Sequence, residues 1–161
     1  MDLGSGTFYY RLGAELSAKL AEAGRTRRLD KGAMLFVEGE EANRVAIVLA
    51  GRLKLVSVSM SGGEAVLAVF GPGELVGEVS LFGGSTRSAT VSAIEPVEVL
   101  VVARDAFENF LTENGEAAVL LIRLMCERLR QSNETRVDIT NESVAVRVAR
   151  KLAALATAHG V

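Results

Sequence analysis

Glycine recurs at short intervals through the middle of the sequence, and this spacing sets the strongest limit on the fold. From Thr26 to Val102, short runs rich in β-branched and apolar residues alternate with glycine or proline-glycine punctuation. The predicted strands are residues 33–37, 44–50, 52–59, 64–70, 88–93 and 98–102. Ser61 to Gly63 predicts a hairpin turn between two of them. Many short strands with regular turns indicate a β-sandwich or a β-barrel.

Size and composition exclude several classes of protein. The chain has 161 residues, of which 49% are hydrophobic and 24% charged, so it is a globular domain, with or without an appendage, and not a disordered chain. Its longest apolar runs, 45–50 and 117–122, fall far short of the roughly 20 residues that a membrane span needs. The start of the chain lacks the features of a signal peptide. A net charge of −2 gives no overall attraction to DNA or to an anionic membrane.

The small number of cysteine and histidine residues excludes further classes of site. The chain has one cysteine, Cys126, and one histidine, His159. An iron–sulfur cluster needs about four thiolates and a zinc site three or four ligands. We therefore expect no metal, no haem, no iron–sulfur cluster and no enzymatic activity. A single cysteine, interpreted here as a packing residue, excludes an internal disulfide framework and favours a cytoplasmic protein.

A glycine-rich segment carries the residues that point to a ligand. It holds the pair Gly77-Glu78 and, nine residues after the glutamate, Arg87 followed by Ser88. Gly77 lets the backbone approach a ligand closely, and the helical turn predicted for residues 78–82 offers unpaired N–H groups to an anion. Arg87 can donate two hydrogen bonds to a phosphate, and the Ser88 hydroxyl can add a third. The Glu78 carboxylate only accepts hydrogen bonds, so a sugar hydroxyl suits it.

Spacing alone leaves two interpretations of this segment open. In the first, Glu78 and Arg87 form a surface ion pair worth about 0–1 kcal/mol beside ordinary turn glycines. In the second, one anion-binding arm and one hydroxyl-binding arm recognise a sugar phosphate, which would make the chain a sensor of a small phosphorylated ligand.

The stretch GEVSLFGGSTRSATV, residues 77–91, resembles the phosphate-binding cassette of cyclic nucleotide-binding domains. The resemblance implies that Glu78 binds the ribose 2′-hydroxyl and that Arg87 binds the cyclic phosphate. It also makes Gly77, Val79 and Ser88 ligand-binding residues, and it favours the sensor interpretation. No catalytic residue is implied.

The same resemblance narrows the fold. It implies a mainly β structure with α-helices: a jelly-roll β-barrel, or double-stranded β-helix, flanked by short helices and followed by a long dimerisation helix and one further helix. Gly39 and Gly51 occupy the positions of corner glycines in that fold. Apolar residues at helical spacing predict an N-terminal helix over residues 12–23. Asp105 is the expected N-cap of a short helix over residues 106–112.

A long helix is predicted from about Glu116 to Val137. Its seam, mostly apolar, repeats every ~3.5 residues, the period of a coiled coil. The seam consists of Ala118, Leu121, Met125, Leu129, Ser132, Arg136 and Ile139. Such a helix is about 33 Å long, more than one small β-roll covers. We therefore expect a parallel homodimer through residues 116–139; the alternative is a helix that lies wholly on its own barrel.

The helical part also resembles the cyclic-AMP receptor and fumarate–nitrate regulator group of bacterial transcription factors. This resemblance implies that Ser132 and Asn133, one turn after Arg128, contact the amino group of adenine. The implied organisation is a cyclic nucleotide-binding β-roll with its N-terminal helix (1–115), a dimerisation helix (116–139), and a hinge with the first helix of a truncated or absent DNA-binding domain (140–161). A polar break at 138–143 and a helix over 144–158 are expected in the last part, and the sequence shows no recognition helix before Val161.

Together these observations predict a cytoplasmic, homodimeric cyclic-nucleotide sensor of a bacterial transcription regulator. Cyclic AMP is the leading ligand, and its binding is expected to rearrange the long helices. DNA would be a partner only through a further C-terminal domain, and no membrane partner is expected. Two alternatives remain: a regulatory module of a kinase or channel, and a ligand-free dimerisation scaffold. The sequence leaves open whether the ligand is cyclic AMP, cyclic GMP or another molecule.

Overall fold

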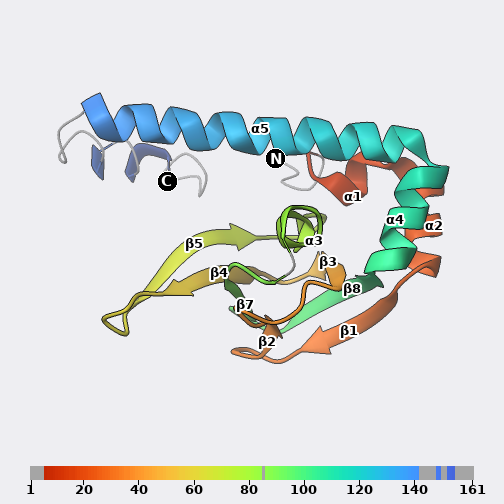
Figure 1. The fold of residues 1–161 in the computed structure, drawn as a ribbon, viewed down its shortest axis with the longest axis horizontal. Coiled ribbons are helices and arrows are strands. Elements are labelled where there is room, and N and C mark those ends of the chain that lie inside the picture. Colours follow the sequence, from red (N-terminus) through yellow and green to blue (C-terminus); the bar gives the residue numbers. More distant parts are fainter. Residues whose placement is uncertain (1–5, 85, 142–147, 150–151, 155–161) are drawn as a thin grey trace. The chain divides into compact units, whose positions relative to one another are not determined.

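The computed structural model describes residues 6–84, 86–141, 148–149 and 152–154 (Figure 1). The chain divides into two compact units, Met1–Leu121 and Ile122–Val161. The first unit contains every described strand, and the second contains the later part of a long helix.

The elements follow one another in a simple order. Helices α1 (Phe8–Arg11) and α2 (Gly13–Glu22) open the described chain. The strands are β1 (Arg25–Leu29), β2 (Met34–Phe36), β3 (Arg44–Ala50), β4 (Leu53–Val58), β5 (Glu64–Phe70), β6 (Leu75–Val76), β7 (Thr90–Ala93) and β8 (Val97–Ala103). The later helices are α3 (Glu78–Gly83), between β6 and β7, and then α4 (Arg104–Glu113) and α5 (Gly115–Asn141).

The strands form two four-stranded antiparallel sheets with the orders β1-β8-β3-β6 and β2-β7-β4-β5. Consecutive strands repeatedly lie in different sheets, which is the jelly-roll arrangement that the family resemblance implied. The two sheets are not joined into a closed barrel. The fold is therefore a two-sheet jelly roll.

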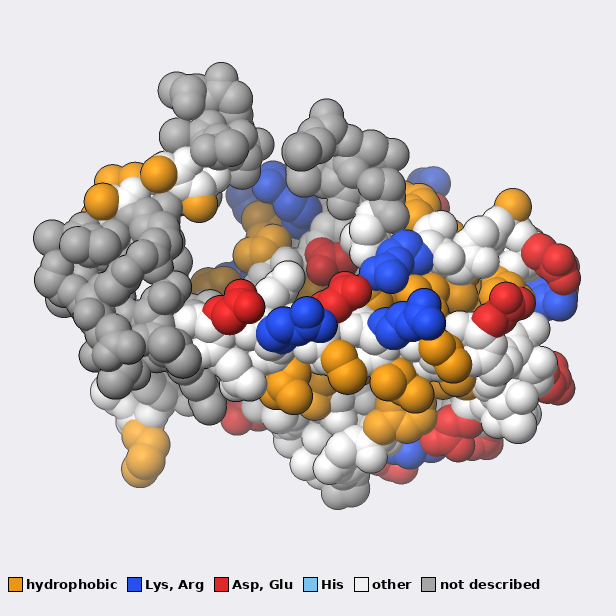
Figure 2. Space-filling view, turned by 90° about the horizontal axis from the view of Figure 1, so that it is seen from above, with side chains coloured by type: hydrophobic (Ala, Val, Ile, Leu, Met, Phe, Trp, Pro, Cys, Tyr) orange, Lys and Arg blue, Asp and Glu red, His pale blue; other side chains and the backbone are white. Residues whose placement is uncertain are grey.

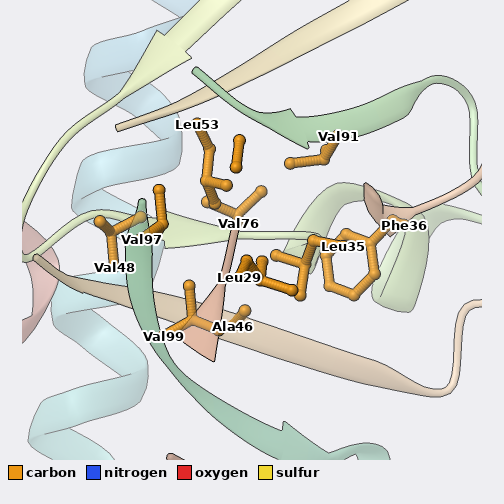
Figure 3. Close-up of a cluster of buried hydrophobic side chains, with 11 residues drawn as sticks. Leu29, Leu35, Phe36, Ala46, Val48, Leu53, Val76, Val91, Val97 and Val99 are labelled. Carbon is orange, nitrogen blue, oxygen red and sulfur yellow. The ribbon is translucent and has the colours of Figure 1, made fainter. Parts of the chain in front are cut away.

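The core lies between the two sheets (Figure 3). Its buried residues are Leu29, Leu35, Phe36, Ala46, Val48, Leu53, Val76, Val91, Ala93, Val97 and Val99. Side chains alternate along a strand, so Val97 and Val99 of β8 point into this core while Leu100 and Val102 point the other way. Both of the latter are also buried, because α4 packs on β3 and β8. Burial on both faces explains why β3 and β8 are nearly continuous apolar runs.

The predicted strands agree well with the observed ones. Strands β3 and β5 have the predicted bounds, and β2, β4, β7 and β8 lie within two residues of theirs. The turn between β4 and β5 is confirmed by the hydrogen bond from Ser59 N to the Gly63 carbonyl at 2.9 Å and by Gly62 at φ +83°. Gly39 and Gly51 also have positive φ, as corner positions require.

Two strands were not predicted. β1 has the sequence RTRRL, with four exposed residues, and it pairs only with β8 at the edge of its sheet. β6 has two residues, too few to show an alternating pattern. The sequence of β1 has no strand pattern of its own. It forms a strand by pairing with β8, which contributes the apolar residues.

Several predictions about the helices are corrected. Helix α4 begins at Arg104 with Ala103 as its N-cap, so Asp105 lies in the first turn and does not cap it. Helix α5 continues to Asn141 through the polar residues that were expected to end it near Val137. Cys126 is exposed and does not pack inside this chain. The helix expected at residues 144–158 lies mostly outside the described residues. None of the described helices has the length and apolar character that crossing a bilayer requires.

Candidate functional site

Gly77 joins β6 to α3 in a conformation that only glycine adopts readily. Its φ of +95° lies in the left-handed region. A Cβ atom built on it would lie 2.8 Å from Nη1 of Arg87 and 2.8 Å from Cε2 of Phe36. The predicted close approach is therefore present, and it brings the chain against the arginine of the same cassette.

Arg87 is buried and its guanidinium is held from several sides. Nη1 donates to the Gly77 carbonyl at 3.0 Å, and Nη2 donates to the Arg44 carbonyl. The guanidinium carbon lies 3.7 Å from the centre of the Phe36 ring, in cation–π geometry. The backbone is fixed as well, because Arg87 N donates to the Glu40 carbonyl and Gly39 N donates to the Arg87 carbonyl.

One nitrogen of this guanidinium makes no hydrogen bond with the described residues. Nε of Arg87 is buried and has no hydrogen-bond partner among them. The neighbouring carboxylate oxygen, Oε1 of Glu40, lies 4.0 Å away, beyond hydrogen-bond distance. An unsatisfied buried donor costs about 1–3 kcal/mol, more when it is charged. The edge formed by Nε and a terminal nitrogen matches two oxygens of a phosphate or carboxylate.

The electrostatic surroundings leave Arg87 short of negative charge. Burial lowers the pKa of its guanidinium, and repulsion from Arg44 and from Arg104 lowers it further, while Glu40 and Glu78 raise it. Arginine stays protonated in proteins in spite of such shifts. The result is a buried, incompletely neutralised cation, which an anionic ligand would stabilise.

Glu78 is the first residue of α3 and is as buried as Arg87, each with 3% of its surface exposed. The interpretation of the two residues as a surface ion pair is therefore wrong. Carboxylates and guanidinium groups are seldom fully buried without a binding or pairing role. α3 itself confirms the short helical turn that was predicted for residues 78–82.

The remaining residues of the cassette differ in their exposure to solvent. Val79 and Ser88 are exposed, whereas Ala89 and Val91 are buried. The Thr90 hydroxyl accepts a hydrogen bond from Glu38 N at 3.0 Å and so ties β7 to the loop after β2. The cassette sequence therefore serves the fold as well as the site.

The residues that surround Arg87 were not predicted from the sequence. Phe36, Glu40 and Arg44 come from β2, the following loop and β3, more than 40 residues before Arg87. They form no motif with the cassette in the sequence. A signal was present only in Gly39, the corner glycine that turns this loop.

Ser132 and Asn133 are exposed residues of α5. They belong to the second compact unit, whereas Glu78 and Arg87 belong to the first, and their contact with adenine stays a prediction. Among the described residues, no group of three or more His, Cys, Asp or Glu side chains is arranged to hold a metal ion.

Comparison with known proteins gives concordant matches. The sequence profile of the cyclic nucleotide-binding domain matches residues 26–114. The CRP-like cAMP-activated global transcriptional regulator of Mycobacterium tuberculosis is 31% identical over 150 residues, which are 92% of this chain and 67% of that protein. The crystal structure of the Thermus thermophilus catabolite activator protein aligns with a TM-score of 0.73 and 28% identity, over 83% of this chain and 62% of that one.

A third match covers only a small part of a much longer protein. Lysophospholipase nte1 of Neurospora crassa is 33% identical over 103 residues, which are 64% of this chain but only 7% of that protein. The matched profile covers more than half of the present chain, and it contains both Glu78 and Arg87. The chain belongs to the cyclic nucleotide-binding domain family.

Proposed function

We propose that this chain is the cyclic-nucleotide sensor of a bacterial transcription regulator, and that it binds cyclic AMP. The observation that carries the proposal is Arg87: a buried guanidinium, held by Gly77 and Phe36, whose Nε has no hydrogen-bond partner in the described part of the chain. A cyclic phosphate supplies two oxygens and one negative charge, which satisfy the free edge and the unbalanced cation together.

Glu78 supports the sugar half of the ligand. Its carboxylate is buried one residue after Gly77, and at neutral pH a carboxylate accepts hydrogen bonds without donating them. A ribose hydroxyl donates to such a group, whereas a phosphate is repelled by it. We propose that Glu78 binds the ribose 2′-hydroxyl beside Val79, and that the Ser88 hydroxyl adds a donor to the phosphate bound by Arg87.

The choice of cyclic AMP rests on sequence. The Mycobacterium tuberculosis relative is named as cAMP-activated, and its match extends over 92% of this chain, including α5. We propose that Ser132 and Asn133 of α5 recognise the adenine amino group, which cyclic GMP lacks. Cyclic GMP is therefore the comparison ligand for every binding experiment.

We propose that α5 also forms a homodimer. Its exposed apolar residues include Val119 (48%), Ile122 (62%) and Leu129 (64%), with the exposed Cys126 between the last two. Their spacing of three, four and three residues is that of a coiled-coil seam. Figure 2 shows hydrophobic side chains gathered along this face beside acidic and basic ones. Leu121, a member of the seam expected from the sequence, is 7% exposed and hence covered, so we place the seam one residue to the side.

The proposed mechanism is a population shift. A ligand that binds one arrangement of the α5 pair more tightly than another favours that arrangement in proportion to the difference in affinity. In the full regulator this change would reposition the segment after α5. The chain spans 67% of the Mycobacterium tuberculosis regulator and 62% of the Thermus thermophilus structure, so DNA binding is proposed for a further part of the protein.

Calorimetric titration with cyclic AMP, cyclic GMP and linear 5′-AMP tests the proposal. We expect cyclic AMP to bind most tightly and Arg87→Ala to weaken its binding at least about 30-fold, since a lost charged partner in a desolvated site costs about 2–5 kcal/mol. Arg52→Ala is the matched control, because Arg52 is exposed and pairs with Glu95. Equal affinity in wild type and Arg87→Ala would rule out the assigned site.

The alternative of a regulatory module in another kind of protein is favoured by one observation, the match to the lysophospholipase. That match is confined to 103 residues, whereas the match to the regulator covers 150. The additional similarity supports the transcription-regulator proposal, because it requires α5 and not the β-roll alone.

A further inference from the structure

Glu40 places a second carboxylate beside the free edge of Arg87. It lies in the loop between β2 and β3, and its side chain is 31% exposed. Oε1 is 4.0 Å from Nε of Arg87. The backbone hydrogen bond from Arg87 N to the Glu40 carbonyl, 2.8 Å long, prevents the two residues from separating.

Arg44 holds this carboxylate at its present distance. Nη2 of Arg44 donates to Oε1 of Glu40 at 3.2 Å and to the Leu35 carbonyl at 3.3 Å. Nη1 of Arg44 donates to the Asn43 side chain at 3.0 Å. The Glu40 carboxylate thus lies between two guanidinium groups. It is hydrogen-bonded to Arg44 and only electrostatically attracted to Arg87.

This arrangement has opposite consequences for the empty and the occupied site. In the empty site, Glu40 stabilises a buried cation that has few other counter-charges, in agreement with its effect on the Arg87 pKa. In the occupied site, a phosphate on the Nε edge brings a second negative charge to within a few ångströms of the carboxylate. Like charges at that separation repel, and half-buried groups are poorly screened by salt.

We propose that Glu40 is a built-in counter-ion of Arg87 that competes with the phosphate of the ligand and thereby raises the ligand concentration at which the site fills. Arg44 limits this competition by keeping the carboxylate away from Nε. The inference rests on the proposed function, since it concerns the same phosphate and the same guanidinium.

Glu40→Gln tests the proposal because it removes the charge while keeping the size of the side chain and an oxygen for Arg44. We expect the Kd for cyclic AMP to fall about three- to tenfold. The melting temperature of the ligand-free protein should fall by about 2–4 °C, because Arg87 loses a counter-charge. A residue with a merely structural role would lower both affinity and stability, so tighter binding together with lower stability is the distinguishing result.

Glu41→Gln is the matched control. Glu41 is the adjacent residue, and its side chain is exposed. It is bound to Thr86 and Asn43 through its backbone. Glu41→Gln changes the net charge by the same amount as Glu40→Gln. We expect its Kd to stay within about twofold of wild type. The difference in Kd for cyclic AMP between the two variants should become smaller in high salt but should not disappear, since Glu40 is only partly exposed.

Arg44→Gln gives a second measurement. Arg44→Gln should weaken cyclic AMP binding, because it releases the Glu40 carboxylate toward Arg87. The weakening should therefore be larger when Glu40 is present than in the double variant that also carries Glu40→Gln. An affinity of Glu40→Gln that equals or falls below that of wild type overturns the counter-ion role while leaving the sensor function in place. If wild type binds neither cyclic AMP nor cyclic GMP, the proposed function fails and this inference fails with it.

Discussion

At the scale of single residues, Arg87 shows how a charge is kept buried and still available. The Gly77 carbonyl, the Arg44 carbonyl and the face of Phe36 hold the guanidinium plane, and none of them carries a negative charge. Fixed dipoles and an aromatic face orient a cation without neutralising it. The site is therefore organised before any ligand arrives, which reduces the loss of conformational freedom on binding.

Gly77→Ala should damage both stability and binding. A side chain at φ +95° is strained, and the new methyl group would lie 2.8 Å from Arg87 Nη1 and from Phe36. We expect a loss of about 2–3 kcal/mol in the free energy of unfolding, measured by urea titration, with clearly weaker cyclic AMP binding. Gly62→Ala is the control, since Gly62 has φ +83° but a methyl group added there would have nothing within 4 Å.

Gly62→Ala isolates the backbone penalty and should cost about 1 kcal/mol with unchanged affinity. Equal losses of stability in the two variants, with full cyclic AMP binding by Gly77→Ala, would show that the close packing around Gly77 does not matter.

At the scale of secondary structure, α5 carries the strongest expectation about assembly. Its exposed row of Val119, Ile122, Cys126 and Leu129 follows the coiled-coil period, while Ala117 and Leu121 in its first turns are buried. One face of the helix is thus used within the first unit and another is left for a partner. A second copy of α5 offers the same row in register.

Ile122→Glu and Leu129→Glu should each convert the proposed dimer to a monomer. Either change places two like charges opposite each other in an apolar seam, where desolvation makes them costly. The oligomeric state is measured by sedimentation velocity at a protein concentration of roughly tens of micromolar, because a weak dimer dissociates at lower concentrations. Arg123→Glu changes an exposed neighbour outside the row and should leave the dimer intact. A wild-type protein that sediments as a monomer would contradict the proposed seam.

At the scale of the whole molecule, sensing requires the phosphate site and α5 to respond to the same ligand. If cyclic AMP binds one arrangement of the dimer more tightly, dimer arrangement and ligand affinity are coupled reciprocally. In the proposed site, Arg87 and Glu78 would bind any cyclic nucleotide alike, since phosphate and ribose are common to all of them. Selection of the base therefore has to come from other residues, for which we propose Ser132 and Asn133.

Ser132→Ala combined with Asn133→Ala should narrow the difference in affinity between cyclic AMP and cyclic GMP. A pocket that hydrogen-bonds one base loses its preference when those polar groups are removed. Arg87→Ala should instead weaken both ligands alike. Parallel titrations of the two nucleotides provide the measurement, with Gln131→Ala as the control on the same helix. A double variant with an unchanged nucleotide preference would exclude these residues from base recognition.

Features that depend on residues close together in the chain could be predicted from the sequence. Strands β3 and β5 follow from apolar runs between glycines, and the positive φ values of Gly39, Gly51 and Gly62 follow from their places in turns. The cassette from Gly77 to Val91 was recognisable because its spacing along the chain is short. Each of these signals is contained within about 15 residues, a range over which backbone geometry limits the outcome.

The surroundings of these segments depend on contacts between distant parts of the chain, which form only on folding. β1 is a strand because β8 lies beside it, despite its exposed arginines. Phe36, Glu40 and Arg44 meet Arg87 because the loop after β2 packs against the start of β7, which no local pattern reports. The period of α5 was visible in the sequence, but its free face was not. Which residues of a helix remain exposed depends on the neighbours that cover its first turns, and those neighbours are brought together only by folding.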